Sequence, residues 1–500
     1  MSLLPIAVRL GSAQTGVHMS DNSVKLEKNA IGLREVVFQS ICSMAPGAAI
    51  AASIPAGAGF AGGALALAVI FAFIGILFTA SSIGQLAKHI PSSGSVATYS
   101  AIGLRPWVGY LVGWGYAAVE VLIVPLVMLQ LGFTAAGEWH SNQKSFPVGS
   151  WWIFTTLGTL LVAFLVWRGI STSAKTGTWL GFFEITVFVL IAIILIVKAG
   201  GHNSLSVFTP SAANAKGFAG WKGVFAGSVF TLLAFSGFEA AAPLAEESKD
   251  PKRNIPRAIM IATVCIGVLY TFTTYAATVN FGKDKFFGFG GYNNGAPWDA
   301  LGHGISSLFY VLVILAVVNS TIANANAGAN VFTRTAYAMG RVGAFPRGLA
   351  KLDPKHKTPR NALVLQLIVG LVVGLLLGWK YTPQTAFGIV ATGLVVIVVV
   401  VYIVANFACI GYFMKHKRDE AHWFVHIVIP ILGAIFLIPG FFSAAGITGI
   451  PGLDFIAKLT YPLNAAVYVM AGWMVVGLIS YFIIKKKNSK AIDDVAQIFM

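Results

Sequence analysis

Twelve apolar stretches, each long enough to cross a lipid bilayer, follow one another along the chain between short polar connections. A bilayer-spanning helix needs about 20 mostly apolar residues. None of these stretches shows the roughly ten-residue alternation of polar and apolar positions that is typical of outer-membrane strands. The pattern therefore predicts an all-α membrane protein with twelve transmembrane helices. The predicted helices cover 36–60, 63–87, 105–135, 150–168, 177–199, 222–244, 257–280, 303–335, 362–379, 384–413, 422–443 and 463–484.

The composition agrees with this interpretation and argues against an enzyme. Charged residues make up only 10% of the 500 residues, whereas soluble domains carry about 25%. The three cysteines lie inside apolar stretches, so we expect them to be buried small residues and not disulfide partners. The nine histidines lack metal-ligand spacing, and the chain has neither a P-loop nor a Ser/His/Asp arrangement. We expect no metal, no cofactor and no catalytic residues.

The net charge of +16 becomes informative once the charges are sorted by connection. If the N-terminus lies in the cytoplasm, the cytoplasmic segments hold 26 of the 34 Lys and Arg residues, and the other side holds 8. Lys and Arg concentrate on the cytoplasmic side of membrane proteins. We therefore expect both termini in the cytoplasm of a cell whose inner (plasma) membrane holds the protein. The excess charge then needs no nucleic-acid partner.

Two predicted helices contain residues that interrupt a helix in mid-membrane. Pro46-Gly47 lies in 36–60, and Ser236-Gly237 lies in 222–244 with Glu239 close behind. Pro lacks an N–H and Gly is conformationally permissive. Irregular backbone at membrane depth is tolerated only where it is buried or lines a cavity. Breaks in the first and sixth helices indicate an inverted-repeat transporter, although simple kinks remain an alternative.

Such breaks can bind an amino acid zwitterion between them. A half-helix N-terminus exposes N–H groups and suits a carboxylate, here at the amides of Gly47, Ala48 and Ala49. A half-helix C-terminus exposes carbonyls and suits an ammonium. The carbonyls concerned lie around 43–45 and 234–235.

Three motifs resemble permeases of the amino acid-polyamine-organocation (APC) superfamily. They are Pro91–Tyr99 running to Gly109–Trp114, Phe235–Glu239 followed by Glu246–Ile259, and Ala325–Thr358. The resemblance covers about 32–487 and implies the LeuT-type fold, secondary active transport and alternating access. It divides the chain into a cytoplasmic tail 1–31, a first five-helix repeat 32–200, an inverted repeat 201–415, two peripheral helices 416–487 and a cytoplasmic tail 488–500.

The resemblance also names the residues of the pocket, with two departures. The family's G-x-G in helix 1 is replaced by Pro46-Gly47-Ala48, and the helix 6 aromatic gate is replaced by Leu233, with Phe230 or Phe235 as substitutes. The predicted substrate-binding residues are Ser43, Met44, Ala45, Pro46, Gly47, Ala48, Ala49, Tyr116, Glu120, Phe230, Leu233, Ala234, Phe235, Ser236 and Gly237.

Three acids inside the predicted helices are candidates for proton coupling, because a charge at the bilayer centre is costly and therefore usually functional. Glu120 shares a helix face with Tyr116, and bacterial putrescine importers, which the chain resembles, carry an acid near this point. Glu184 falls where several proton-coupled members have a Lys. Glu239 resembles the family's helix 6 Glu. For each of them, a structural hydrogen-bonding role is the alternative.

These observations predict a proton-coupled importer of amino acids or related organic amines. Its partners would be that small molecule, a coupling proton or cation and the lipid bilayer. An exchanger of the same substrates and an inorganic-cation transporter on the same fold remain alternatives. Relatives include monomers and dimers, so a homodimer is left open.

Overall fold

A computed structural model describes residues 31–92, 94–143, 147–168, 174–341, 343, 345–356 and 358–487. The predicted tails, 1–31 and 488–500, lie outside these residues except for Ile31. The described residues form helices and no β-strand, so the all-α prediction is confirmed. The α-helices are α1 Leu33–Met44, α2 Pro46–Ala48, α3 Ile54–Ala61, α4 Leu65–His89, α5 Ser95–Gly103, α6 Pro106–Asn142, α7 Trp151–Trp167, α8 Ala174–Ala199, α9 Trp221–Phe235, α10 Pro251–Phe281, α11 Pro297–His303, α12 Ser307–Arg341, α13 Arg360–Tyr381, α14 Pro383–His416, α15 Ile429–Ala445 and α16 Ala465–Lys487.

Tighter or wider helical turns connect several of these elements. The π-helical η1 (Ala49–Ser53) joins α2 to α3, and the 3-10 segments η7 (Phe238–Glu246) and η8 (Lys283–Gly295) follow α9 and α10. The remaining short turns are η2 Gly62–Ala64, η3 Val148–Ser150, η4 Gly200–His202, η5 Leu205–Phe208, η6 Pro210–Ala212, η9 Arg347–Ala350 and η10 Phe424–Val428.

Eleven helical stretches of the described chain are long and apolar enough to cross a membrane. Ten of them coincide one by one with predicted helices, and the first two predicted helices fall together in the 57-residue stretch Leu33–His89. A straight helix of that length would measure about 85 Å, far more than the roughly 30 Å of a bilayer core. The chain instead bends within it at Gly62, where φ is +52°.

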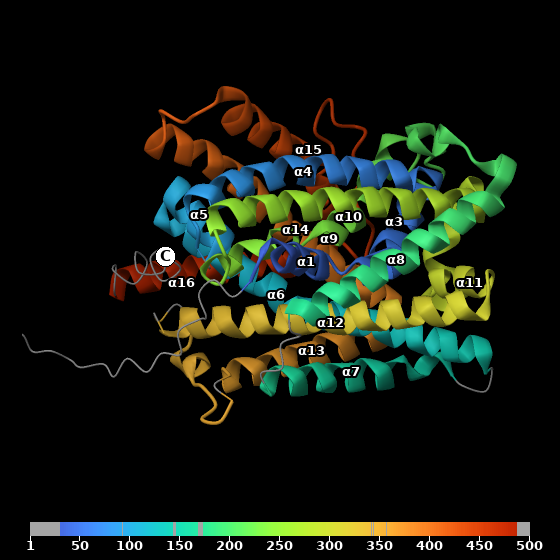
Figure 1. Ribbon diagram of the computed structural model, residues 1–500, viewed down its shortest axis with the longest axis horizontal. Coiled ribbons are helices and arrows are strands. Elements are labelled where there is room, and N and C mark those ends of the chain that lie inside the picture. The colour runs from blue at the N-terminus through green and yellow to red at the C-terminus, as the bar shows by residue number, and fades with distance from the viewer. Residues whose placement is uncertain are drawn as a thin grey trace, which may run out of the picture.

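The long helices lie roughly along the longest dimension of the molecule (Figure 1). α4 and α15 pack together along one edge, and α7 and α13 pack together along the opposite edge. Between them, α6 contacts α12, α14 and α7, while α4 contacts α10 and α9. α6 and α14 therefore form the centre against which the other helices pack.

Burial separates central from peripheral helices. In its most apolar 18-residue window, α14 has 83% of its residues buried, whereas α16 has 17%. Small residues allow the central helices to approach closely. Gly328 of α12 faces Ile123 of α6 so closely that a Cβ there would lie 2.9 Å from the Ile123 Cβ. The lack of a side chain at Gly328 thus allows α12 to approach α6 closely.

Candidate functional site

The first helix is interrupted at Ala45. α1 ends at Met44, and Ala45 takes a left-handed conformation with φ 48° and ψ 67° before Pro46 begins α2. Pro46 has no N–H and its ring clashes with the carbonyl four residues earlier in a continuous helix. The residue before a proline is also driven out of the helical region. The break therefore follows from the local sequence.

The second interruption lies between α9 and η7. α9 ends at Phe235, and Ser236 is extended, with φ −59° and ψ 133°. Gly237 then has φ 102°, a value that residues with a Cβ rarely adopt. After Gly237 the chain continues as the 3-10 helix η7 with a different axis.

The two interruptions lie directly against each other. A Cβ added to Gly237 would lie 2.9 Å from the carbonyl carbon, the carbonyl oxygen and the Cβ of Ser43. The Ser40 hydroxyl donates to the Phe238 carbonyl at 2.8 Å and accepts from the Ala241 N–H at 3.0 Å. α1 is thereby held to the start of η7 on one side of the breaks.

Tyr270 of α10 links the C-terminal ends of both half-helices. Its hydroxyl lies 3.0 Å from the Met44 carbonyl and 3.1 Å from the Ala234 carbonyl. Carbonyls at a helix end have no intrahelical partner, so one buried hydroxyl serves two of them. Tyr270 was not among the predicted site residues, although a tyrosine in an apolar stretch is itself a signal, because a buried tyrosine hydroxyl usually finds a partner.

Replacing Tyr270 with phenylalanine is expected to lower the free energy of unfolding by about 1–3 kcal/mol, because two buried carbonyls lose their shared donor. Thermal or denaturant unfolding of the purified protein measures this. Tyr275→Phe, on the same helix, removes a hydroxyl that donates to Asn203 at 3.2 Å in an exposed position, and we expect a change below about 0.5 kcal/mol. Equal stability of the two variants would contradict the linking role of Tyr270.

A small cavity lies between the breaks. The centre of a water molecule can move within about 40 Å³ of it. One water needs about 10–15 Å³ by this measure, so the cavity holds a few waters. It is lined by Ser43, Met44, Ala45, Ala48, Ala49, Ser53, Val119, Ile123, Leu126, Val127, Gln130, Leu233, Ala234, Ser236, Asn324 and Leu394. Eight of the predicted substrate-binding residues are among these.

The predicted residues that do not line the cavity are Pro46, Gly47, Tyr116, Glu120, Phe230, Phe235 and Gly237. The α6 wall of the cavity is instead formed by the neighbouring helix face, which includes Val119 and Ile123. The cavity also has two amide side chains that were not among the predicted binding residues. Gln130 donates to the Ala48 carbonyl at 2.9 Å, and Asn324 donates to the Ser43 carbonyl at 3.3 Å.

Glu184 of α8 binds the start of the second half of the broken first helix. The Gly47 N–H donates to Glu184 Oε2 at 3.2 Å, and the Asn319 amide of α12 donates to Glu184 Oε1. The Ala49 N–H donates to the Ala45 carbonyl at 2.8 Å. Two of the three amides expected to face a substrate carboxylate therefore have protein partners.

Glu239 is held by two tyrosines. Tyr116 of α6 donates to Glu239 Oε1 at 2.8 Å, and Tyr402 of α14 donates to Oε2 at 2.9 Å. Glu120 lies near both Tyr116 and Glu239. All three predicted acids are buried, with Glu120 6%, Glu184 3% and Glu239 1% exposed. Among the described residues, no ion pair involves any of them.

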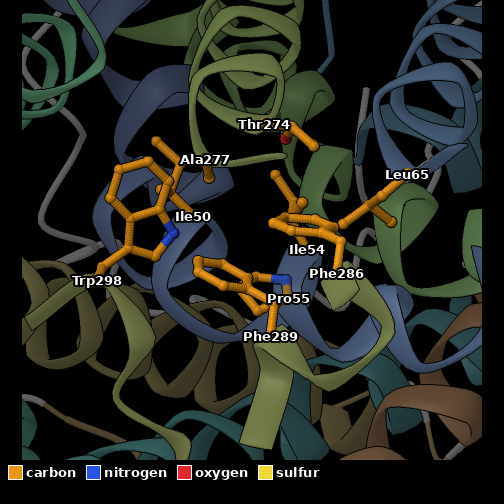
Figure 2. A pocket seen from close by; sticks show the side chains of 9 residues that line it. All are labelled: Ile50, Ile54, Pro55, Leu65, Thr274, Ala277, Phe286, Phe289 and Trp298. Carbon is orange, nitrogen blue, oxygen red and sulfur yellow. The ribbon is translucent and has the colours of Figure 1, made fainter. Parts of the chain in front are cut away.

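The η8 end of the site is closed by aromatic packing. Phe230 stacks on Phe60 of α3, with ring centroids 5.6 Å apart. Beyond them, Phe286, Phe289 and Trp298 line a small space together with Ile50 and Ile54 of the first helix (Figure 2). The space between these side chains is about 10 Å³, which is room for at most one water. The side chains around this second cavity are therefore closely packed.

Two further acids are buried near this end, and the sequence analysis did not single them out. Glu138 of α6 accepts a hydrogen bond from Asn293 and is 8% exposed, and Asp299 of α11 is 5% exposed. Burial raises the pKa of Asp299 well above its usual range, and the negative charge of Glu138 adds to this. The ionised form of Asp299 is therefore disfavoured.

The opposite end of the site is closed by backbone hydrogen bonds. The Ile31 N–H donates to the Glu247 carbonyl at 3.2 Å, and the Lys249 N–H donates to the Ile31 carbonyl at 2.9 Å. The segment before α1 is thereby joined to the segment after η7. The two broken helices are thus joined to their neighbours by contacts at both ends of the site.

The two broken helices are accompanied by a match to a known family. Residues 35–493 match the family described as amino acid permease. The chain belongs to the amino acid permease family. The resemblance to the APC superfamily is therefore confirmed, and the permease is a multi-pass membrane protein of a transporter family.

Individual relatives are similar at a lower level of identity. The low-affinity putrescine importer PlaP of Escherichia coli (strain K12) is 27% identical over 394 residues, which cover 75% of the permease and 80% of the relative. The branched-chain amino acid permease BcaP of Bacillus subtilis (strain 168) is 25% identical over 467 residues, covering 87% and 88%. The histidine permease HisP of Lactococcus lactis subsp. cremoris (strain MG1363) is 25% identical over 308 residues, covering 60% and 63%.

Proposed function

We propose that the permease imports amino acids or related organic amines across the inner (plasma) membrane by alternating access, coupled to protons. The observation that carries this proposal is the cavity lined by both interrupted helices. Membership of the amino acid permease family supports it. The relatives named for putrescine, branched-chain amino acids and histidine support both amines and amino acids as substrates.

The proposed architecture has twelve membrane spans, with 32–200 and 201–415 as inverted repeats of five spans and 416–487 as two peripheral spans. α1 and α3 would form the first span, and α9 and η7 the sixth. The contacts between helices support this division. If each span is replaced by the span five positions away in the other repeat, a pair of helices in contact becomes another pair in contact. The contact of α4 with α9 corresponds to that of α10 with α1, that of α6 with α14 to that of α12 with α8, and that of α8 with α10 to that of α14 with α4.

The orientation follows the Lys and Arg distribution of the sequence. With both termini and the tails 1–31 and 488–500 in the cytoplasm, η8 and the stacked Phe60 and Phe230 close the cavity from outside. The bonds of Ile31 with Glu247 and Lys249 close it from inside. Import would then proceed by opening the outer contacts, binding substrate, closing them and breaking the inner ones.

Glu184 is the proposed proton-coupling group because its hydrogen bonds depend on its charge. Both of its oxygens accept bonds, one from Gly47 of the first repeat and one from Asn319 of the second. An ionised carboxylate accepts strongly at both oxygens, whereas a protonated one carries a hydrogen on one oxygen, which makes that oxygen a weaker acceptor. Protonation would therefore loosen a connection between the two repeats. Glu239, between Tyr116 and Tyr402, and Glu120 beside it are the alternative proton carriers.

Uptake into proteoliposomes tests this function. Leucine and putrescine, each radiolabelled, are the probes, and an interior one pH unit more alkaline than the outside provides the driving force. One coupled proton can support about tenfold accumulation across such a difference. We expect one probe to accumulate with the gradient and to equilibrate without it. Uptake that is equal with and without the gradient would contradict proton symport, and uptake only into preloaded vesicles would indicate exchange.

A further inference from the structure

The central cavity has a polar side and an apolar side. The polar side is formed by the two helix breaks, with Ser43, Ser53, Ser236 and the amide of Asn324, and the amide of Gln130 adds one polar group on the α6 side. The apolar side is an aliphatic wall of branched side chains from three helices, which are Val119, Ile123, Leu126 and Val127 of α6, Leu233 of α9 and Leu394 of α14. Of the sixteen described residues that line the cavity, none carries a formal charge and none is aromatic.

The buried acids Glu120, Glu184 and Glu239 are not among the residues that line this cavity. Glu184 is occupied by Gly47 and Asn319, and Glu239 by Tyr116 and Tyr402. Glu120 interacts with the Glu239 group and does not line the cavity. An ammonium bound in the cavity would therefore meet neutral carbonyl, hydroxyl and amide groups.

A diamine fits such a lining poorly. It would bring two positive charges into a site without a carboxylate, and burying a charge is costly unless it is paired. The lining also lacks an aromatic face, which would be the other way to hold a second ammonium or a guanidinium. A zwitterion has no net charge, and its two ends can be bound by the polar groups of the breaks.

We propose that the transported substrate is a zwitterionic amino acid with an aliphatic side chain, which packs against the wall of Val119, Ile123, Leu126, Val127, Leu233 and Leu394. This inference rests on the proposed function and narrows its substrate class. The amino and carboxylate groups lie at the breaks, and the aliphatic group lies across the cavity against α6. Diamines and basic amino acids are excluded by the neutral lining.

Thermal unfolding of the purified permease over a ligand panel tests this inference, because a ligand of the folded state raises the Tm. The panel contains leucine, isoleucine, valine, phenylalanine, lysine, aspartate and putrescine. We expect the three aliphatic amino acids to raise the Tm in a saturable manner, and lysine and putrescine to leave it unchanged. If putrescine, lysine or phenylalanine raises the Tm and the aliphatic amino acids do not, the aliphatic assignment is wrong and the proposed function still stands. If no compound raises the Tm and none is taken up, both fail.

The second measurement is the leucine affinity of a variant with a polar substitution that keeps the shape of the aliphatic wall. Val127→Thr exchanges one methyl for a hydroxyl inside the cavity. We expect leucine to bind roughly tenfold more weakly, because its side chain would bury a hydroxyl that has no hydrogen-bond partner. Val475→Thr makes the same exchange on α16 at a position that is 55% exposed, and should bind leucine like the wild type. Unchanged leucine affinity in a folded Val127→Thr variant would contradict the packing of the side chain against α6.

Discussion

Replacing Gly237 with valine is expected to abolish transport and to lower the free energy of unfolding by about 2–5 kcal/mol. The estimate combines the cost of a left-handed conformation with that of overpacking. Gly237 has φ 102°, and a Cβ there would lie 2.9 Å from three atoms of Ser43, two of which are backbone atoms that cannot move aside alone. The contact between the two broken helices would be forced open. Uptake assays and unfolding of the purified variant measure both effects.

Gly59→Val is the matched control for this substitution. Gly59 lies in α3, in the same broken helix, and a Cβ there would meet no atom within 4 Å. Valine has a slightly better helix propensity than glycine, so we expect stability within about 0.5 kcal/mol of the wild type and normal uptake. Wild-type transport by Gly237→Val would contradict the close packing of the two breaks.

Replacing Glu184 with glutamine is expected to remove the stimulation of uptake by an inward proton gradient. Glutamine keeps the shape of the side chain but cannot exchange a proton. Its NH₂ group would also face one of two donors, Gly47 N–H or the Asn319 amide, and an unmade buried hydrogen bond costs about 1–3 kcal/mol. We therefore expect slower uptake whose rate is the same with and without the gradient.

Glu420→Gln controls for the loss of an acid as such. Glu420 pairs with Lys417 at 2.7 Å on the surface, where ion pairs contribute little, so gradient stimulation should be that of the wild type. If Glu184→Gln is stimulated as strongly as the wild type, Glu184 does not carry the coupling proton. Glu239 and Glu120 would then be the remaining candidates.

The sequence predicts those features of the fold that depend on local chemistry. Apolar stretches mark the helices because a bilayer requires about 20 such residues. The interruptions lie where a proline and a glycine make a continuous helix unfavourable, with left-handed backbone at Ala45 and Gly237. The positions of the helices and of their interruptions depend on residues that are neighbours in the chain, so the sequence predicts them without knowledge of the helix packing.

The partners of the site residues could not be predicted in this way, because they come from distant parts of the chain. Gly47 and Glu184 are 137 positions apart, and Tyr116 and Glu239 are 123 apart. Tyr270, which joins the ends of two half-helices, belongs to a third element. Each of these contacts is fixed by helix packing and leaves no periodic signal in the sequence.

The face of α6 that lines the cavity could not be predicted from the sequence either. Helical periodicity places Tyr116 and Glu120 on one face. A central helix is buried on all sides, however, and periodicity does not say which face meets which neighbour. In the structure this face meets Glu239, while Val119 and Ile123 line the cavity.

The central claim is that the cavity between the two breaks is the substrate site, and binding of radiolabelled leucine to a Val119→Trp variant tests it most directly. The indole would occupy the cavity that Val119 lines, whereas Leu157→Trp places the same side chain on α7 at a position that is 59% exposed. We expect saturable binding by the wild type and by Leu157→Trp, and none by Val119→Trp. Wild-type leucine affinity in a folded Val119→Trp protein would contradict this location of the substrate site.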